Sequence, residues 1–152
     1  MLDTLTFALA YLAYVLLGAD VVFRLWKHGR RQLTAVLAVV LVAHVALVWG
    51  HRFGGALEVA LEKSIPGFVI FHLAFVLILA AAVIRPERVA SRLLYLAFPV
   101  CTAGALGAAF RYDYVAAYQV PLLVAVLVVL LLGSVPVRER RRRPAQTFRK
   151  QL

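Results

Sequence analysis

The sequence predicts an all-α integral membrane protein, a five-transmembrane-helix bundle with the N-terminus outside and the C-terminus in the cytoplasm. Of the 152 residues, 64% are hydrophobic, well above the roughly 45–50% typical of soluble domains. The apolar residues gather in five segments, each close to the about 20 residues that a membrane-spanning helix needs. Lys and Arg are concentrated in alternate connections between these segments, which is the pattern that fixes membrane orientation.

The five apolar segments are bounded by charged residues, Gly or Pro, and each predicts one spanning helix. They cover residues 5–23, 33–50, 68–84, 93–110 and 115–132. We therefore expect one transmembrane domain over residues 1–135, followed by a basic cytoplasmic tail over residues 136–152.

The basic residues set the expected orientation. With the N-terminus outside, all of the 17 Lys and Arg lie on the cytoplasmic side except Arg52, Lys63 and Arg111. This bias suits the bacterial inner membrane. The net charge of +10 does not indicate a nucleic-acid partner, because the cations flank apolar segments instead of forming one compact face. We expect the tail to bind anionic membrane lipid.

Two histidines lie inside neighbouring predicted spans at nearly the same depth. His44 is six residues before Gly50, where the second span ends, and His72 is five residues after Gly67, where the third begins. At the helical rise per residue these depths are about 9 Å and about 7.5 Å. Consecutive helices with a short connection are usually adjacent. We therefore expect the two imidazoles to approach one plane in the outer leaflet.

Paired imidazoles at one depth are typical of a haem held between helices by two axial ligands. His44 and His72 are the predicted ligands of one b-type haem. Arg52 and Arg111 are the predicted partners of its propionates. His51 follows His44 by two turns of a regular helix and is expected to act at the haem edge or at a quinone pocket. The predicted function is a membrane electron-transfer subunit linked to the quinone pool, part of an oxidoreductase.

Two alternatives use the same residues differently. A membrane histidine can donate a hydrogen bond across a helix interface, and the chain would then be a cofactor-free accessory or scaffold subunit of a larger membrane complex. Small residues four positions apart within 103–108 suit packing against another subunit or a second copy. Alternatively, the histidines could bind a non-haem metal together with Glu58 or Glu62 of the first outer loop.

Two further features are local. Asp20 lies near the inner end of the first span, four residues before Arg24. This spacing predicts an ion pair within one helix, with a role in proton transfer as the alternative. In the first outer loop, Leu57, Ala60 and Leu61 share one helical face, which predicts a short amphipathic helix on the membrane surface.

Overall fold

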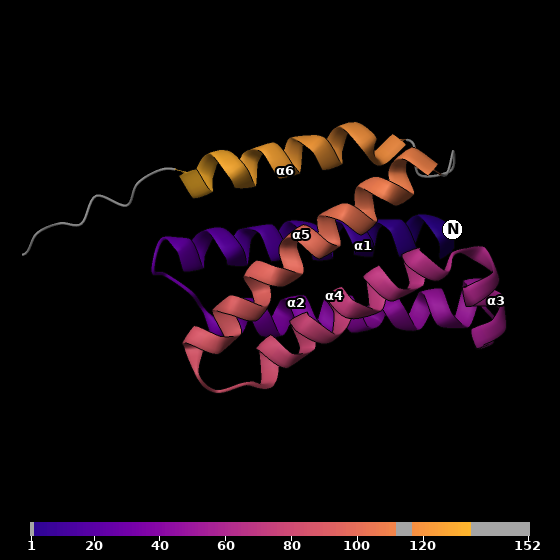
Figure 1. Cartoon of the computed structure of the whole chain (residues 1–152), viewed down its shortest axis with the longest axis horizontal. Coiled ribbons are helices and arrows are strands. Elements are labelled where there is room, and N and C mark those ends of the chain that lie inside the picture. Colours follow the sequence, from indigo (N-terminus) through magenta and orange to yellow (C-terminus); the bar gives the residue numbers. More distant parts are fainter. Residues whose placement is uncertain (1, 112–116, 135–152) are drawn as a thin grey trace, which may run out of the picture.

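The computed structural model describes residues 2–111 and 117–134, apart from the side chain of Lys63. Every regular element in these ranges is helical, and together they form the bundle shown in Figure 1. The elements, in chain order, are α1 (Leu2–Leu25), α2 (Arg31–Leu47), the π-helix η1 (Val48–Arg52), α3 (Leu57–Lys63), α4 (Ile65–Val83), α5 (Glu87–Arg111) and α6 (Gln119–Ser134).

Within the described ranges, four helical segments are long and apolar enough to cross a membrane. They are α1, the continuous segment Arg31–Arg52 formed by α2 and η1, α4 and α5. This confirms the prediction of an all-helical protein of the integral membrane class. The fifth predicted span corresponds to α6, an apolar helix of 16 residues. The predicted tail, 136–152, lies outside the described residues.

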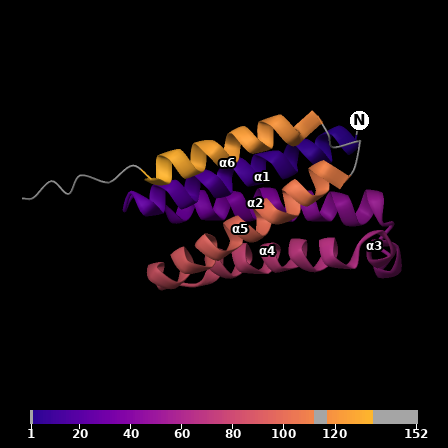
Figure 2. The same ribbon diagram turned by 45° about the horizontal axis from the view of Figure 1, so that its top comes forward.

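Helix α1 is central to the bundle, because it packs against α2, α5 and α6, while α4 packs against α5 and α2. Figures 1 and 2 show α6 lying along α1. The two helices run in the same direction. The Tyr11 hydroxyl donates to the Pro121 carbonyl (3.4 Å), and Trp26 Nε1 donates to the Leu132 carbonyl (3.1 Å).

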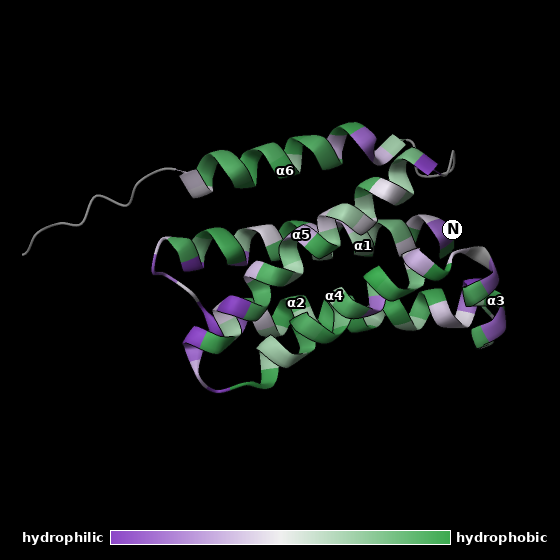
Figure 3. Ribbon diagram, in the orientation of Figure 1, coloured by the Kyte–Doolittle hydropathy of each residue, from purple (hydrophilic) through white to green (hydrophobic). Residues whose placement is uncertain are grey.

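Hydrophobic residues predominate along the helices and hydrophilic residues gather near their ends (Figure 3), as expected for a bundle with lipid around its middle and water at its ends. Large apolar side chains are exposed along the bundle; Val39 and Val120 are each 69% exposed and Val83 is 77% exposed. An aqueous surface would disfavour so many exposed apolar groups. The interior is also apolar, with Leu17, Leu37, Ile78 and Leu94 almost fully buried.

The two ends of the bundle differ in charge, and the following names are kept for them. The basic end comprises the loops after α1 and after α4 with the first turns of α2 and α5. The opposite end comprises the start of α1, η1, α3 and the start of α4 (Figure 1). The exposed cations of the basic end are Lys27, Arg30, Arg31, Arg85, Arg88 and Arg92.

Candidate functional site

His44 lies on α2 where this helix faces both α1 and α4. Its side chain is nearly buried, with the residue 5% exposed. Nδ1 donates to the Thr6 carbonyl of α1 at 2.9 Å, and the ring meets Phe71 of α4 edge-on, with 5.7 Å between centroids. Thr6 is itself buried, and its hydroxyl donates to the Leu2 carbonyl at 2.8 Å. The His44 imidazole is therefore fixed in orientation by a neighbouring helix.

His72 lies on α4 and is surrounded by aromatic rings. Its Nδ1 donates to the Phe68 carbonyl one turn earlier, at 2.8 Å. The Phe68 ring lies 3.9 Å from the imidazole, centroid to centroid, and Trp49 of η1 meets it edge-on at 6.1 Å. The residue is partly buried. Backbone hydrogen bonding thus occupies Nδ1 of His72, as it does in His44.

One aromatic side chain, Phe71, connects the two histidines. Its ring centroid is 5.7 Å from that of His44 and 6.0 Å from that of His72, so the two imidazole centroids are at most 11.7 Å apart. The structure therefore brings both predicted ligands to one neighbourhood between α2 and α4.

The second ring nitrogen of each imidazole, Nε2, is the atom that remains available to bind a ligand. Within 2–111 and 117–134, no hydrogen bond is made by Nε2 of His44 or of His72. The same ranges contain no fully buried side-chain nitrogen or oxygen without a partner, so Nε2 of His44 keeps an accessible edge. In a neutral imidazole that donates through Nδ1, Nε2 carries the lone pair that binds a metal.

The π-helix η1 begins four residues after His44 and continues α2 with a wider turn. The Val48 backbone N–H donates to the carbonyls of His44 and Val45, and that of Phe53 donates to the Val48 carbonyl at 3.3 Å. π-Helical turns are rare and are often found at functional sites. Here the turn places Trp49 against the His72 ring.

The π-turn also contains His51, which we expected on the face of His44. His51 Nε2 lies 3.8 Å from Asp3 Oδ1 at the start of α1, and His44 Nδ1 bonds to the Thr6 carbonyl of the same helix. Both histidines therefore have a partner on α1, and His51 lies at the outer edge of the opposite end, which we call the rim. Its expected role at the haem edge or at a quinone pocket stays a prediction.

The two arginines predicted to hold propionates also lie at the opposite end. Arg52 Nε is 3.1 Å from Asp3 Oδ1, and its guanidinium lies over the Phe7 ring, 5.0 Å from the centroid. Arg111 Nη1 lies 3.4 Å from the Ser64 hydroxyl at the start of α4. Both cations therefore lie at the rim of the opposite end, and His44 and His72 lie deeper in the bundle near the same end.

The alternative metal site is not assembled in the described part of the chain. Glu58 and Glu62 lie on α3, which forms as predicted, and both are exposed. Among the residues that the structure describes, no group of three or more His, Cys, Asp or Glu side chains comes close enough to hold a metal ion. A bis-histidine haem differs from such a site because it needs only two protein ligands.

A second polar cluster lies near the basic end, and we refer to it as the Arg24 cluster (Asp20, Arg24, Thr34, Glu87 and Ser91). The predicted ion pair within α1 is confirmed, with Arg24 Nε 2.8 Å from Asp20 Oδ1. The Thr34 hydroxyl accepts from Arg24 Nη2 at 2.7 Å and donates to Asp20 Oδ2 at 2.6 Å. Arg24 Nη1 also donates to the Glu87 carboxylate, and to the Ser91 hydroxyl at 3.0 Å.

The Arg24 cluster joins three helices and has no open position for a ligand among its central groups. Asp20 is completely buried, and the side chain of Arg24 is 2% exposed. Buried charges need such pairing, because an unpaired ion in an apolar medium is very costly. The sequence predicted only the Asp20–Arg24 pair, since Thr34, Glu87 and Ser91 come from other helices.

Comparison with known proteins gives no further assignment. No protein family matches this chain, and neither the curated proteins nor the solved structures include a significant match.

Proposed function

We propose that this chain is a b-type haem-binding electron-transfer subunit in which His44 and His72 would hold one haem. The observation that supports the proposal is the matched state of the two imidazoles. Each Nδ1 donates to a backbone carbonyl, each Nε2 makes no hydrogen bond within the described ranges, and both rings contact Phe71. Histidines that bind metals commonly have this arrangement, because the Nδ1 bond fixes the tautomer and the orientation of the ring.

The surroundings fit a haem in two respects. Aromatic rings from η1 and α4 provide an apolar environment, which raises the cost of charge at the iron and so influences its potential. Arg52 and Arg111, at the rim, would pair with the propionates. Because Phe71 contacts both imidazoles, the proposal requires its ring to turn aside when the haem binds.

The residues of the chain divide the proposed task between them. When bound, the haem supplies one-electron chemistry. His44 and His72 would hold it between α2 and α4, and the aromatic rings around them would keep water out of the site. His51, beside Asp3 at the rim, would exchange a proton with a quinone headgroup, because an imidazole can both donate and accept a hydrogen bond. The subunit would carry electrons between the quinone pool and a partner on the outer side.

The proposal includes five spans in a bacterial inner membrane, with the N-terminus outside. Two observations support it. The six exposed cations of the basic end lie on the side that the positive-inside pattern assigns to the cytoplasm. Helix α6 runs parallel to α1, as shown by the Tyr11–Pro121 hydrogen bond near one end and the Trp26–Leu132 hydrogen bond near the other. The first and fifth spans of a five-span protein must cross the membrane in the same direction.

The test is the absorption spectrum of the full-length protein, purified from membranes of cells supplied with a haem precursor. We expect Soret and α bands in the dithionite-reduced protein and haem b in the pyridine extract. The variants His44→Ala and His72→Ala should each lose the α band. The control is His28→Ala, which changes a histidine at the basic end. A wild-type protein that folds without absorbing visible light would reject the proposal.

A cofactor-free accessory subunit is the second candidate, favoured by the exposed face of α5. Ala103 and Gly107 are exposed, and a Cβ added to Gly107 would meet nothing within 4 Å. Gly104 instead faces α4, where an added Cβ would lie 3.0 Å from Ile70 Cγ2. Half of the predicted small-residue pattern is thus left for another membrane subunit or a second copy. Cross-linking through Ala103→Cys in native membranes tests this role: specific dimers or adducts support it, and monomer alone rejects it.

A further inference from the structure

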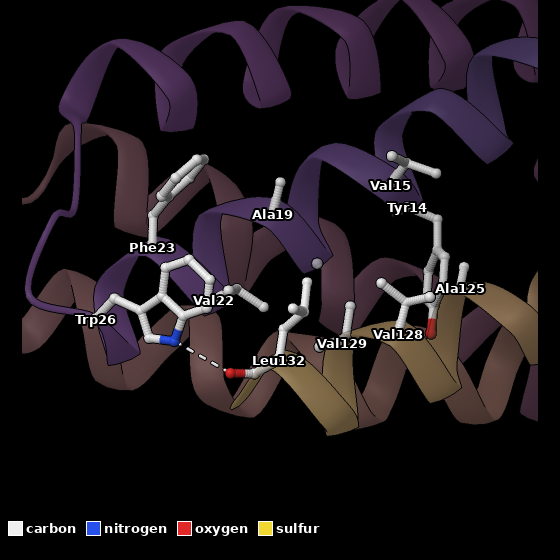
Figure 4. Close-up of a pocket in the computed structure, with 11 residues that line it drawn as sticks. Tyr14, Val15, Ala19, Val22, Phe23, Trp26, Ala125, Val128, Val129 and Leu132 are labelled. Carbon is white, nitrogen blue, oxygen red and sulfur yellow. Dashed lines mark hydrogen bonds between the residues drawn. The ribbon is translucent and has the colours of Figure 1, made fainter. Parts of the chain in front are cut away.

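An apolar groove runs between α1 and α6, apart from the histidines (Figure 4). Its volume is about 230 Å³. Most of its walls are aliphatic or aromatic side chains, and Gly18 and Ala19 form the α1 wall where the side chains are smallest. Val15, Phe23 and Val128, which border the groove, are each more than 40% exposed. The groove therefore opens toward the hydrocarbon of the membrane.

The groove forms because the two parallel helices pack closely at one position and leave space unfilled at the next. A Cβ added to Gly18 would lie 2.6 Å from Val129 Cγ2, so α1 and α6 approach closely at that point because glycine has no side chain. Next to it, Ala19 and Ala125 are too short to fill the space between the helices. The close contact at Gly18, next to two short side chains, therefore leaves an open groove along the interface between α1 and α6.

The groove offers no polar group to a ligand, because its two polar side chains are already paired. The Tyr14 hydroxyl is 2.7 Å from the Thr102 hydroxyl of α5, and Trp26 Nε1 donates to the Leu132 carbonyl at 3.1 Å. A ligand headgroup bound inside the groove would lose its hydrogen bonds to water without replacement. The groove therefore suits an unsubstituted hydrocarbon chain.

Basic residues lie at the Trp26 end of the groove. Lys27 and His28 follow Trp26 directly, and the His28 ring bonds to the Trp26 carbonyl at 2.5 Å. Helix α6 ends at Ser134, two residues past Leu132. Lys27 thus supplies positive charge at this mouth.

We propose that the α1–α6 groove binds one acyl chain of an anionic phospholipid, whose phosphate lies at the mouth beside Lys27. Tryptophan at the membrane interface marks the depth at which headgroups begin, and Trp26 has that position here. Each Lys or Arg near a membrane surface contributes about 1 kcal/mol toward binding anionic lipid. The apolar walls accept the chain, and Lys27 selects the headgroup. The proposal is independent of the haem.

The experiment measures lipids retained by the full-length protein in native mass spectrometry, after exchange into a mixture of phosphatidylglycerol and phosphatidylcholine with identical acyl chains. We expect selective retention of phosphatidylglycerol. The variant Ala19→Phe, which fills the groove, should reduce retention of that lipid at least fivefold. Ala8→Phe is the matched control, because Ala8 is exposed on the same helix and does not line the groove. Lys27→Gln should lower the preference for phosphatidylglycerol about fivefold, from the same energy per charge.

Folding of the Ala19→Phe variant is checked by its helical circular dichroism, and Ala125→Phe blocks the groove from its other wall. Equal retention of the two lipids by the wild-type protein would overturn the proposal. So would undiminished phosphatidylglycerol retention in both groove-filling variants. Recovery of a quinone in place of phospholipid, lost on Ala19→Phe, would also overturn it and would identify an isoprenoid tail as the occupant.

Discussion

The two polar sites inside this bundle differ in whether their hydrogen-bonding groups are all occupied. In the Arg24 cluster, Asp20 receives bonds from both Arg24 and Thr34, and the guanidinium bonds to groups from three helices. At His44 and His72, only Nδ1 is bonded within the described chain. The arrangement in the Arg24 cluster stabilises the fold. The arrangement at the histidines leaves the lone pair of Nε2 on each ring available to bind a ligand.

The comparison leads to opposite expectations for substitutions at the two sites. Changes in the Arg24 cluster should lower the free energy of unfolding and leave ligand binding intact in whatever protein folds. Changes at the histidines should remove the ligand with a small effect on stability.

The largest effect is expected from Arg24→Ala. This variant leaves the completely buried Asp20 carboxylate without its cation, and breaking a buried pair typically costs about 3–5 kcal/mol. Thermal unfolding in detergent micelles, followed by circular dichroism, measures the loss. Arg88→Ala is the control, because Arg88 is exposed at the same end. Equal midpoints for the two variants would show that the Arg24 cluster has no structural role.

A smaller loss is expected from Thr34→Val, which keeps the shape of the side chain and removes its hydroxyl. Thr34 is 2% exposed and bridges Arg24 Nη2 and Asp20 Oδ2. Leaving buried groups unsatisfied costs about 1–3 kcal/mol. The same unfolding measurement applies, with Thr4→Val, at an exposed position of α1, as the control. A variant as stable as this control would mean that the hydroxyl bridge contributes nothing.

His44→Leu sharpens the contrast between the two sites. In haem-free protein it removes one neutral hydrogen bond, to the Thr6 carbonyl, and such bonds contribute about 0.5–1.5 kcal/mol. Haem binding should nevertheless be lost completely. Both quantities come from one preparation, titrated with haem and then unfolded. Undiminished haem binding by this variant would remove His44 from the site.

The smallest effect is expected from Asp3→Asn, which removes the carboxylate beside His51 and Arg52 at the rim. Asp3 is 58% exposed at its side chain, and exposed pairs contribute about 0–1 kcal/mol. We expect a midpoint within 2 °C of the wild type, measured at low salt where such pairs are strongest. A larger loss would place the rim among the structural contacts.

The sequence was sufficient for the features that depend on composition and on spacing within one helix. The lengths of the apolar segments predicted the long helices, and the four-residue spacing predicted the Asp20–Arg24 pair. It could not supply Thr34 or Ser91, because partners across helices depend on how each helix is rotated about its axis. The π-turn at 48–52 was also unpredicted, because it depends on backbone hydrogen bonds that spacing within the sequence does not reveal.

The central claim is that His44 and His72 together bind one haem iron, and electron paramagnetic resonance of the oxidised, purified protein tests it most directly. Two imidazole ligands predict a low-spin ferric signal at one haem per chain. In His72→Ala, loss of one ligand should convert the retained haem to a high-spin signal or release it. No haem signal in the wild type, or the same low-spin signal in the variant, would contradict the account.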